Sequence, residues 1–151
     1  MSKLVLSLLF ILAACAPRPG LPPPPDPAFQ SPGAGWLPGA ETRESVFFLG
    51  TEGALRYGGI VRVWMMQNRT YAGGRGLRGE KSLRYRAEFD CRARLTRTMQ
   101  TSAFAEVNAT GRALLLDAPA VSAWQPLPPD SIGVRNAVVA CGWIGGSGLR
   151  D

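Results

Sequence analysis

One stretch of the chain, residues 82–97, constrains the fold more than any other. Apolar side chains occupy every second position, and charged or hydroxyl side chains occupy the positions between. The apolar set is Leu83, Tyr85, Ala87, Phe89, Cys91, Ala93 and Leu95, and the polar set is Arg84, Arg86, Glu88, Asp90, Arg92, Arg94 and Thr96. A period of two places alternate side chains on opposite faces of a strand, whereas a helix repeats every ~3.6 residues. We therefore predict one long strand over residues 82–97, with one face on a core and the other in water.

Several shorter segments also have the composition of strands. They are residues 45–49, 59–66, 99–107 and 112–116, which are rich in apolar or β-branched side chains and are bounded mostly by Gly or Asn. The segment 108–111 is predicted to join the last two strands. No proline occurs between Ala40 and Ala118, as expected for a sheet.

The end of the chain changes to a helical period. Pro128-Pro129-Asp130-Ser131 predicts a helix start, because Asp130 or Ser131 can cap the free amides. Val134, Val138 and Cys141 then share one helical stripe, and Gly142 or Gly145-Gly146 marks an end. The chain is therefore expected to fold as a single α+β domain.

The N-terminus has the pattern of a signal peptide. Lys3 precedes an apolar run from Leu4 to Ala14, whose eleven residues would rise only ~16 Å as a helix, against ~30 Å for a bilayer core. Leu12-Ala13-Ala14-Cys15 matches what a bacterial lipoprotein signal peptidase recognises. We predict cleavage after residue 14, lipidation of Cys15 by diacylglycerol and a palmitate-type acyl chain, and anchoring in the outer membrane. The alternative is ordinary cleavage after Ala16, which removes Cys15.

Nine of the 13 prolines lie in residues 16–40. Prolines without a repeat favour extended polyproline II and bury no core. We expect a signal peptide over residues 1–14, a lipidated cysteine and Pro/Gly-rich tether over 15–35, a folded domain over 36–146 and a tail over 147–151.

The chain has three cysteines. If Cys15 carries lipid, Cys91 and Cys141 remain as one pair in an oxidising envelope, where disulfides persist. Cys91 lies on the apolar face of the predicted strand and Cys141 on the apolar stripe of the predicted helix. A bridge between them would join helix to sheet across the core. The alternative is two unpaired buried thiols.

A family resemblance rests on these same segments. The run from Lys81 to Cys91, the run from Arg97 to Gly111, and Pro129-Asp130-Ser131 followed by Asn136-Ala137 and Cys141 resemble the surface-adhesin protein E family. That family consists of small bacterial outer-membrane lipoproteins. The resemblance implies an antiparallel β-sheet with a C-terminal helix packed across it, a disulfide between Cys91 and Cys141, and in some members a homodimer. It also implies adhesin-like binding of host matrix and plasma proteins.

Four arginines of the predicted strand, Arg84, Arg86, Arg92 and Arg94, form a possible anion-binding face. Glu88 and Asp90 interrupt it, so we favour the alternative of a solvated face whose charges pair with one another. The formal net charge of +6 favours acidic partners such as lipid A phosphates, sulfated glycans or acidic proteins. Nucleic acid is not expected, because the tryptophans lie where core or rim positions are predicted.

The composition gives little support for catalysis. The chain has no histidine, so a serine or cysteine lacks its ordinary general base, and two cysteines alone make a poor zinc site. Residues 74–79 match G-x-G-x-x-G, but a strand pattern follows where a nucleotide site needs a helix, so a hairpin loop is predicted. We expect a protein that is not an enzyme and needs no metal or other cofactor.

Two functions remain open at this stage. The first is a lipid-anchored, adhesin-like module at the cell surface that binds a host or matrix protein. The second is a periplasm-facing structural or assembly lipoprotein that binds peptidoglycan, lipopolysaccharide or another envelope protein. The sequence identifies no ligand and no ligand-contact residue for either function.

Overall fold

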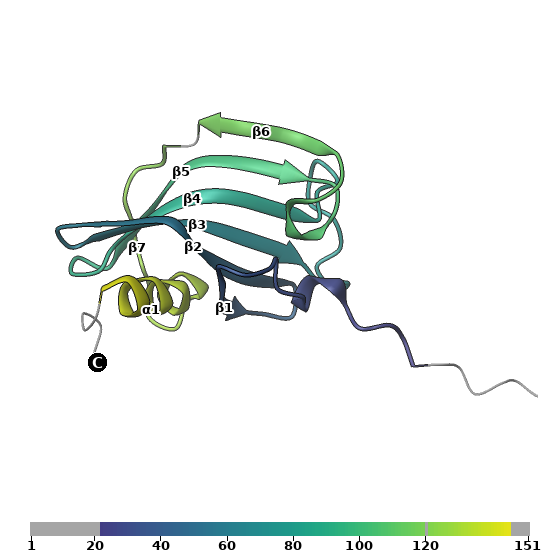
Figure 1. Ribbon diagram of the computed structural model, residues 1–151, viewed down its shortest axis with the longest axis horizontal. Coiled ribbons are helices and arrows are strands. Elements are labelled where there is room, and N and C mark those ends of the chain that lie inside the picture. The colour runs from purple at the N-terminus through teal and green to yellow at the C-terminus, as the bar shows by residue number, and fades with distance from the viewer. Residues whose placement is uncertain (1–21, 120, 146–151) are drawn as a thin grey trace, which may run out of the picture.

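The computed structural model describes residues 22–119 and 121–145. The predicted signal peptide, Cys15 and the first part of the tether lie outside these residues, as does the predicted tail. The folded part is a curled antiparallel sheet with one helix against it (Figure 1).

Six of the seven strands of the sheet follow one another in the order of the sequence. They are β1 (Trp36–Glu41), β2 (Ser45–Tyr57), β3 (Ile60–Arg69), β4 (Ser82–Asp90), β5 (Leu95–Phe104) and β6 (Ala113–Pro119). Every strand pairs antiparallel with the next, and the short β7 (Gln125–Pro126) pairs with β5. Each connection can be short because antiparallel neighbours need no crossover. The predicted antiparallel sheet is confirmed.

The helix α1 (Ile132–Gly145) crosses one face of the sheet. It begins where the sequence predicts, because Ser131 Oγ accepts a hydrogen bond from the Val134 amide at 3.1 Å. The predicted apolar stripe is partly wrong, since Val138 is 49% exposed. Small residues make the close contact instead, with Ala137 and Cys141 buried on the sheet side.

The main core lies between α1 and the sheet. It consists of Ala40, Phe47, Leu49, Val61, Val63, Met65, Ala87, Phe89, Cys91, Leu127, Ala137, Ala140 and Cys141. On β3 and β4 these residues alternate with polar ones, so the period of two in the sequence does mark one dry face.

A disulfide joins Cys91 to Cys141, with 5.9 Å between their Cα atoms and 50 residues between them in the sequence. Cys91 directly follows β4, and Cys141 faces the sheet from α1. Both side chains are buried. The predicted bridge between helix and sheet is confirmed.

The long strand predicted over residues 82–97 is wrong beyond residue 90. The chain turns at residues 91–94, and β5 begins at Leu95. Asp90 Oδ1 accepts hydrogen bonds from the amides of Arg92 at 3.0 Å and Ala93 at 2.8 Å, which closes the turn. Arg94 takes a φ of 56°, in the left-handed region. The apolar alternation continues through the turn at Cys91, Ala93 and Leu95, so the pattern alone does not indicate that the chain reverses direction there.

Part of the Pro/Gly-rich segment belongs to the folded body. Residues 36–41 form β1, and the 3-10 turn η1 (Pro27–Phe29) packs against the domain with Ala28 fully buried. Strand β2 also continues past Gly50 to Tyr57, beyond its predicted end. Residues 27–29, within the tether predicted over residues 15–35, therefore pack against the folded domain.

Candidate binding face

We call the face of the sheet that points away from α1 the open face. On β3 it presents Arg62 and Trp64, which alternate with core residues. In the pairing register Trp64 lies opposite Arg86, and Arg62 lies opposite Glu88. Glu88 in turn lies opposite Arg97 on β5.

One end of the open face is covered. The turns η1 and η2 (Val107–Ala109) lie there, next to a small buried cluster of Val46, Phe48 and Met66. The fully buried Asn68 links the two turns. Its Nδ2 donates to the Ala28 carbonyl at 3.2 Å and to Asn108 Oδ1 at 2.6 Å, and its Oδ1 accepts from the Asn108 amide at 2.8 Å.

The other end of the open face holds a carboxylate that water does not reach. The Glu88 side chain is 0% exposed, and it accepts hydrogen bonds from the Tyr57 hydroxyl, Arg62 Nε at 2.7 Å and Arg97 Nε at 2.6 Å. Burial alone raises the pKa of the Glu88 carboxyl, but these hydrogen bonds outweigh burial and hold the pKa below its ordinary value. Arg97 also stacks over Trp124, 4.5 Å from the ring centroid. This cluster is satisfied internally, so it stabilises the face.

Trp64 holds two other arginines at the centre of the face. The Arg84 and Arg86 guanidinium carbons lie 5.0 Å and 5.2 Å from its ring centroid, within cation–π range. Across residues 22–119 and 121–145, neither arginine forms an ion pair, and the buried Nε of each lacks a hydrogen-bond partner. These two guanidinium groups thus lie against an aromatic ring, and no carboxylate of the described residues pairs with them.

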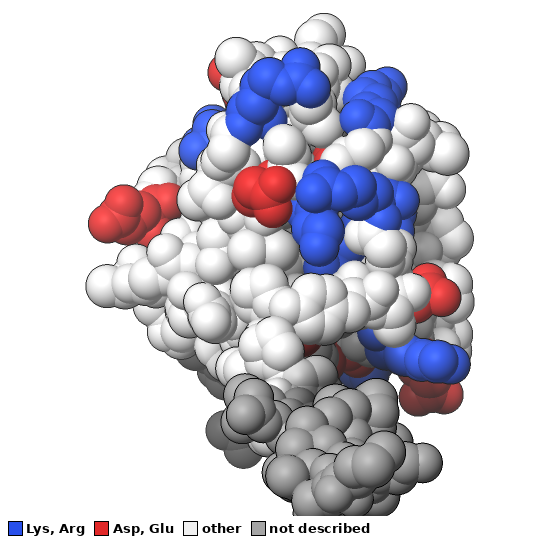
Figure 2. Space-filling model, turned by 90° about the vertical axis from the view of Figure 1, so that its right-hand side faces the viewer, with Lys and Arg blue, Asp and Glu red and all other residues white. Residues whose placement is uncertain are grey.

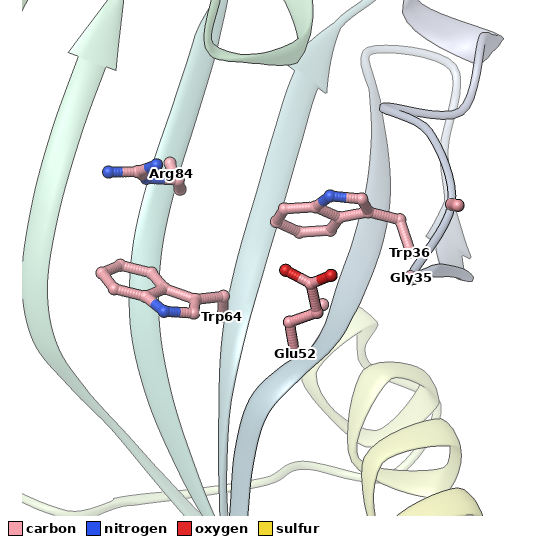
Figure 3. A pocket seen from close by; sticks show the side chains of 7 residues that line it. Gly35, Trp36, Glu52, Trp64 and Arg84 are labelled. Atoms are coloured by element: carbon pink, nitrogen blue, oxygen red, sulfur yellow. The ribbon is translucent and has the colours of Figure 1, made fainter.

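A pocket of about 230 Å³ opens beside Trp64 (Figure 3). Its lining comes from Ala34, Gly35, Trp36, Gly50, Glu52, Trp64 and Arg84. In Figure 3 the Glu52 carboxylate lies below the Trp36 ring, and Arg84 lies above the Trp64 ring. A Cβ built on Gly50 would lie 3.2 Å from Trp64 Cβ and 3.4 Å from the Trp36 ring. Glycine at position 50 therefore lets the Trp36 ring lie close to the backbone of β2 beside Trp64.

A second pocket of about 210 Å³ lies on the helix side of the sheet. It is lined by Phe47, Tyr85, Ala87, Phe89, Thr96, Thr98, Ile132, Gly133 and Asn136. Burial raises the pKa of the Tyr85 phenol. The lining carries no group charged at neutral pH, so this pocket offers less to a specific polar ligand than the one beside Trp64.

The structure separates the four arginines of the possible anion-binding face. Arg84 and Arg86 lie together on the open face, as predicted. Arg92 and Arg94 instead lie in the turn after β4. The strand runs ~20 Å from Arg84 to its end at Asp90, so these two arginines lie farther than that along the sheet from Arg84. Both are exposed there, so the four arginines do not lie on one continuous face.

Charge at the end of the molecule near the β3–β4 loop is mixed. Figure 2 faces this end and shows basic side chains in separate groups with acidic side chains among them. The glycine-rich residues 74–79 form the β3–β4 connection, as predicted. Arg75 donates there to the Gly79 and Ala105 carbonyls at 2.9 Å and 2.8 Å, so it closes the loop.

Sequence reasoning missed the residues that line the pocket beside Trp64. The alternation Val61-Arg62-Val63-Trp64-Met65 places Trp64 on the polar face with Arg62, and this signal was present in the sequence. Trp36 and Glu52 had no such signal. They reach the pocket only because β1 and β2 pair in a register that sets Trp36 opposite Gly50.

Metal-binding groups and membrane-spanning helices can be assessed only for the part of the chain that the structure describes. No group of three or more His, Cys, Asp or Glu side chains is arranged there to hold a metal ion. No helix in it has the length and hydropathy needed to cross a membrane.

Comparisons with known proteins identify related sequences and folds. The family model for surface-adhesin protein E matches residues 36–142. A structure of Haemophilus influenzae protein E in crystal form II superposes with a TM-score of 0.58 at 16% identity, covering 77% of this chain and 97% of that chain. Another structure of the same protein gives a TM-score of 0.57 at 16% identity, with 76% and 89% covered.

A structure of protein E from non-typeable Haemophilus influenzae gives a TM-score of 0.51 at 15% identity, covering 81% of this chain and 88% of that chain. At such identities the superpositions show a shared fold. No curated protein sequence matches the chain.

Proposed function

The chain belongs to the surface-adhesin protein E family, and from this premise we propose that it is an outer-membrane lipoprotein that acts as an adhesin-like binding module. Its ligand is a protein of the host or of the extracellular matrix. The observation that carries the proposal is the extent of the family match, because residues 36–142 include the whole sheet and nearly all of α1.

The anchor that we propose is a lipid on Cys15, at the end of the Leu12-Ala13-Ala14-Cys15 sequence. The Cys91–Cys141 disulfide supports export, because such bonds persist in oxidising compartments. With lipid at Cys15 and a Pro/Gly-rich segment before η1, the domain stands away from the membrane. The open face then remains accessible at its centre.

Lipidation is tested by metabolic labelling of the full chain with an alkyne analogue of palmitate. We expect label on the wild-type protein, which fractionates with outer membranes, and no label on Cys15→Ser. A Cys91→Ala/Cys141→Ala double variant is the matched control, because it removes two cysteines and keeps the label. Labelling of Cys15→Ser, or soluble wild-type protein, would contradict the anchor.

Adhesion is tested on cells that carry the wild-type protein or Cys15→Ser. Protease added to intact cells should remove the wild-type domain from the surface, and wild-type cells should adhere to a reconstituted basement-membrane matrix. The Cys15→Ser cells should adhere no better than cells without the gene. A domain protected from protease until the outer membrane is opened would instead support the periplasm-facing alternative.

A further inference from the structure

The pocket beside Trp64 has the parts of a ligand site that the family match does not assign. Two indole rings, Trp36 and Trp64, line it, and Gly50 adds no side chain beside them. Flat aromatic surfaces of this kind pack against the apolar C–H faces of a ring. The pocket volume of about 230 Å³ lies below the ~300–1,000 Å³ that drug-sized ligands occupy, so it suits one ring.

The polar groups of the pocket differ in what they bind. Glu52 offers a carboxylate that accepts hydrogen bonds, and Figure 3 shows it below the Trp36 ring. Arg84 offers N–H donors and a positive charge, with no ion-pair partner among the described residues. Arg86 lies on β4, as Arg84 does, and adds a second positive charge 5.2 Å from the centroid of the Trp64 ring.

The balance of charge selects the kind of ring. Glu52 and Arg84 balance each other in the lining, and Arg86 beside Trp64 makes the surroundings of the pocket net positive, which disfavours a cationic ligand such as a quaternary amine. A guanidinium without a partner binds a carboxylate through charge-assisted hydrogen bonds, and its planar fork matches that group. Glu52 requires donors elsewhere on the ligand, and hydroxyl groups supply them.

We propose that this pocket binds a single pyranose unit that carries one carboxylate, a uronic or sialic acid residue of a host glycan. The carboxylate lies toward Arg84, the ring lies against Trp36 and Trp64, and hydroxyl groups donate to Glu52. This inference deepens the proposed function, since a surface module meets such glycans on matrix and plasma proteins. It names a ligand class that the family match does not supply.

The test is a titration of the full-length protein in detergent micelles, with tryptophan fluorescence as the readout. The probes are sialyllactose, a glucuronate-containing hyaluronan tetrasaccharide and neutral lactose. We expect a saturable change with at least one acidic probe at millimolar concentration and a weaker response to lactose. The two acidic probes distinguish sialic from uronic acid as the source.

Three variants locate the binding. Arg84→Gln should weaken binding of the acidic probe by at least about tenfold, because it removes a charge-assisted hydrogen bond. Glu52→Gln should weaken binding by several fold. Arg56→Gln is the matched control, because Arg56 is exposed on β2 and does not line the pocket, and it should leave the affinity unchanged.

Absence of saturable binding by both acidic probes would overturn the proposal. An equal loss with Arg56→Gln and Arg84→Gln would also overturn it, since that result indicates attraction by net charge alone. The adhesion test stays separate. Matrix adhesion without saccharide binding refutes only the pocket assignment, whereas saccharide binding without adhesion refutes only the proposed function.

Discussion

Replacing Glu88 with glutamine tests how the open face is held together. Glutamine has nearly the same shape, but it lacks the negative charge and turns one acceptor into a donor that points at the N–H groups of an arginine. Breaking a buried ion pair from one side costs about 3–5 kcal/mol. The partners Arg62 and Arg97 have side chains 29% and 27% exposed, so water partly compensates them. We expect Glu88→Gln to lower the free energy of unfolding by about 2–3 kcal/mol, at or just below the lower limit of that range.

Urea unfolding followed by tryptophan fluorescence measures this loss. With a slope of about 1–3 kcal/mol per molar urea, the midpoint should fall by roughly 1–2 M at an unchanged slope. Glu106→Gln is the matched control, because Glu106 pairs with Arg75 at 3.5 Å and both side chains are about half exposed. It should change stability by at most about 1 kcal/mol. Equal losses in the two variants would refute the assignment of Glu88 as a buried, doubly paired carboxylate.

The pH dependence gives a second check on the same residue. The pKa of Glu88 is held below the ~4.3 of an unfolded glutamate. A lowered pKa in the folded state adds stability that is complete above the unfolded pKa and is lost as the pH falls through the folded value. The stability gap between wild type and Glu88→Gln should therefore be constant from pH 7 to about 5 and should narrow below about pH 4.

Two further changes test the bridge and the N-terminal contact. Cys141→Ser should lower the free energy of unfolding by about 2–5 kcal/mol, because the bridge to Cys91 closes a loop of about 50 residues in the unfolded chain. Thiol titration of denatured, unreduced wild-type protein should find neither of these two cysteines free. Asn68→Ala removes the hydrogen bonds to Ala28 and Asn108, which should cost about 1–3 kcal/mol and expose residues before β1 to limited proteolysis. Unchanged cleavage in that variant would show that other contacts hold the segment.

Much of the architecture was predictable from periodicity. The alternation on β3 and β4 marks the dry face, and Ser131 marks the start of α1, because each depends on neighbours in the sequence. The turn at residues 91–94 was not predictable from the apolar pattern, since the side chain of Asp90 decides it. The proline-rich composition of residues 15–35 predicts an extended tether, yet the buried Ala28 holds residues 27–29 to the domain.

The candidate site was less accessible to sequence reasoning than the fold. Arg84 and Arg86 were identified as neighbours on one face, and the structure brings them together. Trp36 and Glu52 come from strands whose pairing register is a property of the whole sheet. Their approach to Trp64 depends on the absence of a side chain at Gly50, which no local pattern indicates.

The contact between η1 and the domain has a mechanical consequence for a cell held in flowing liquid. If the domain is anchored through Cys15, a pulling force reaches Asp26–Gln30 before it reaches the sheet. That contact depends on a few hydrogen bonds and one buried alanine, whereas the strands are joined by continuous ladders. This contact should open first and release the nine residues from Asp26 to Ala34, up to ~32 Å of added reach, because Gly35 is still bonded to Thr51 of β2. The segment before β1 would then lengthen under the first load while the sheet stays folded.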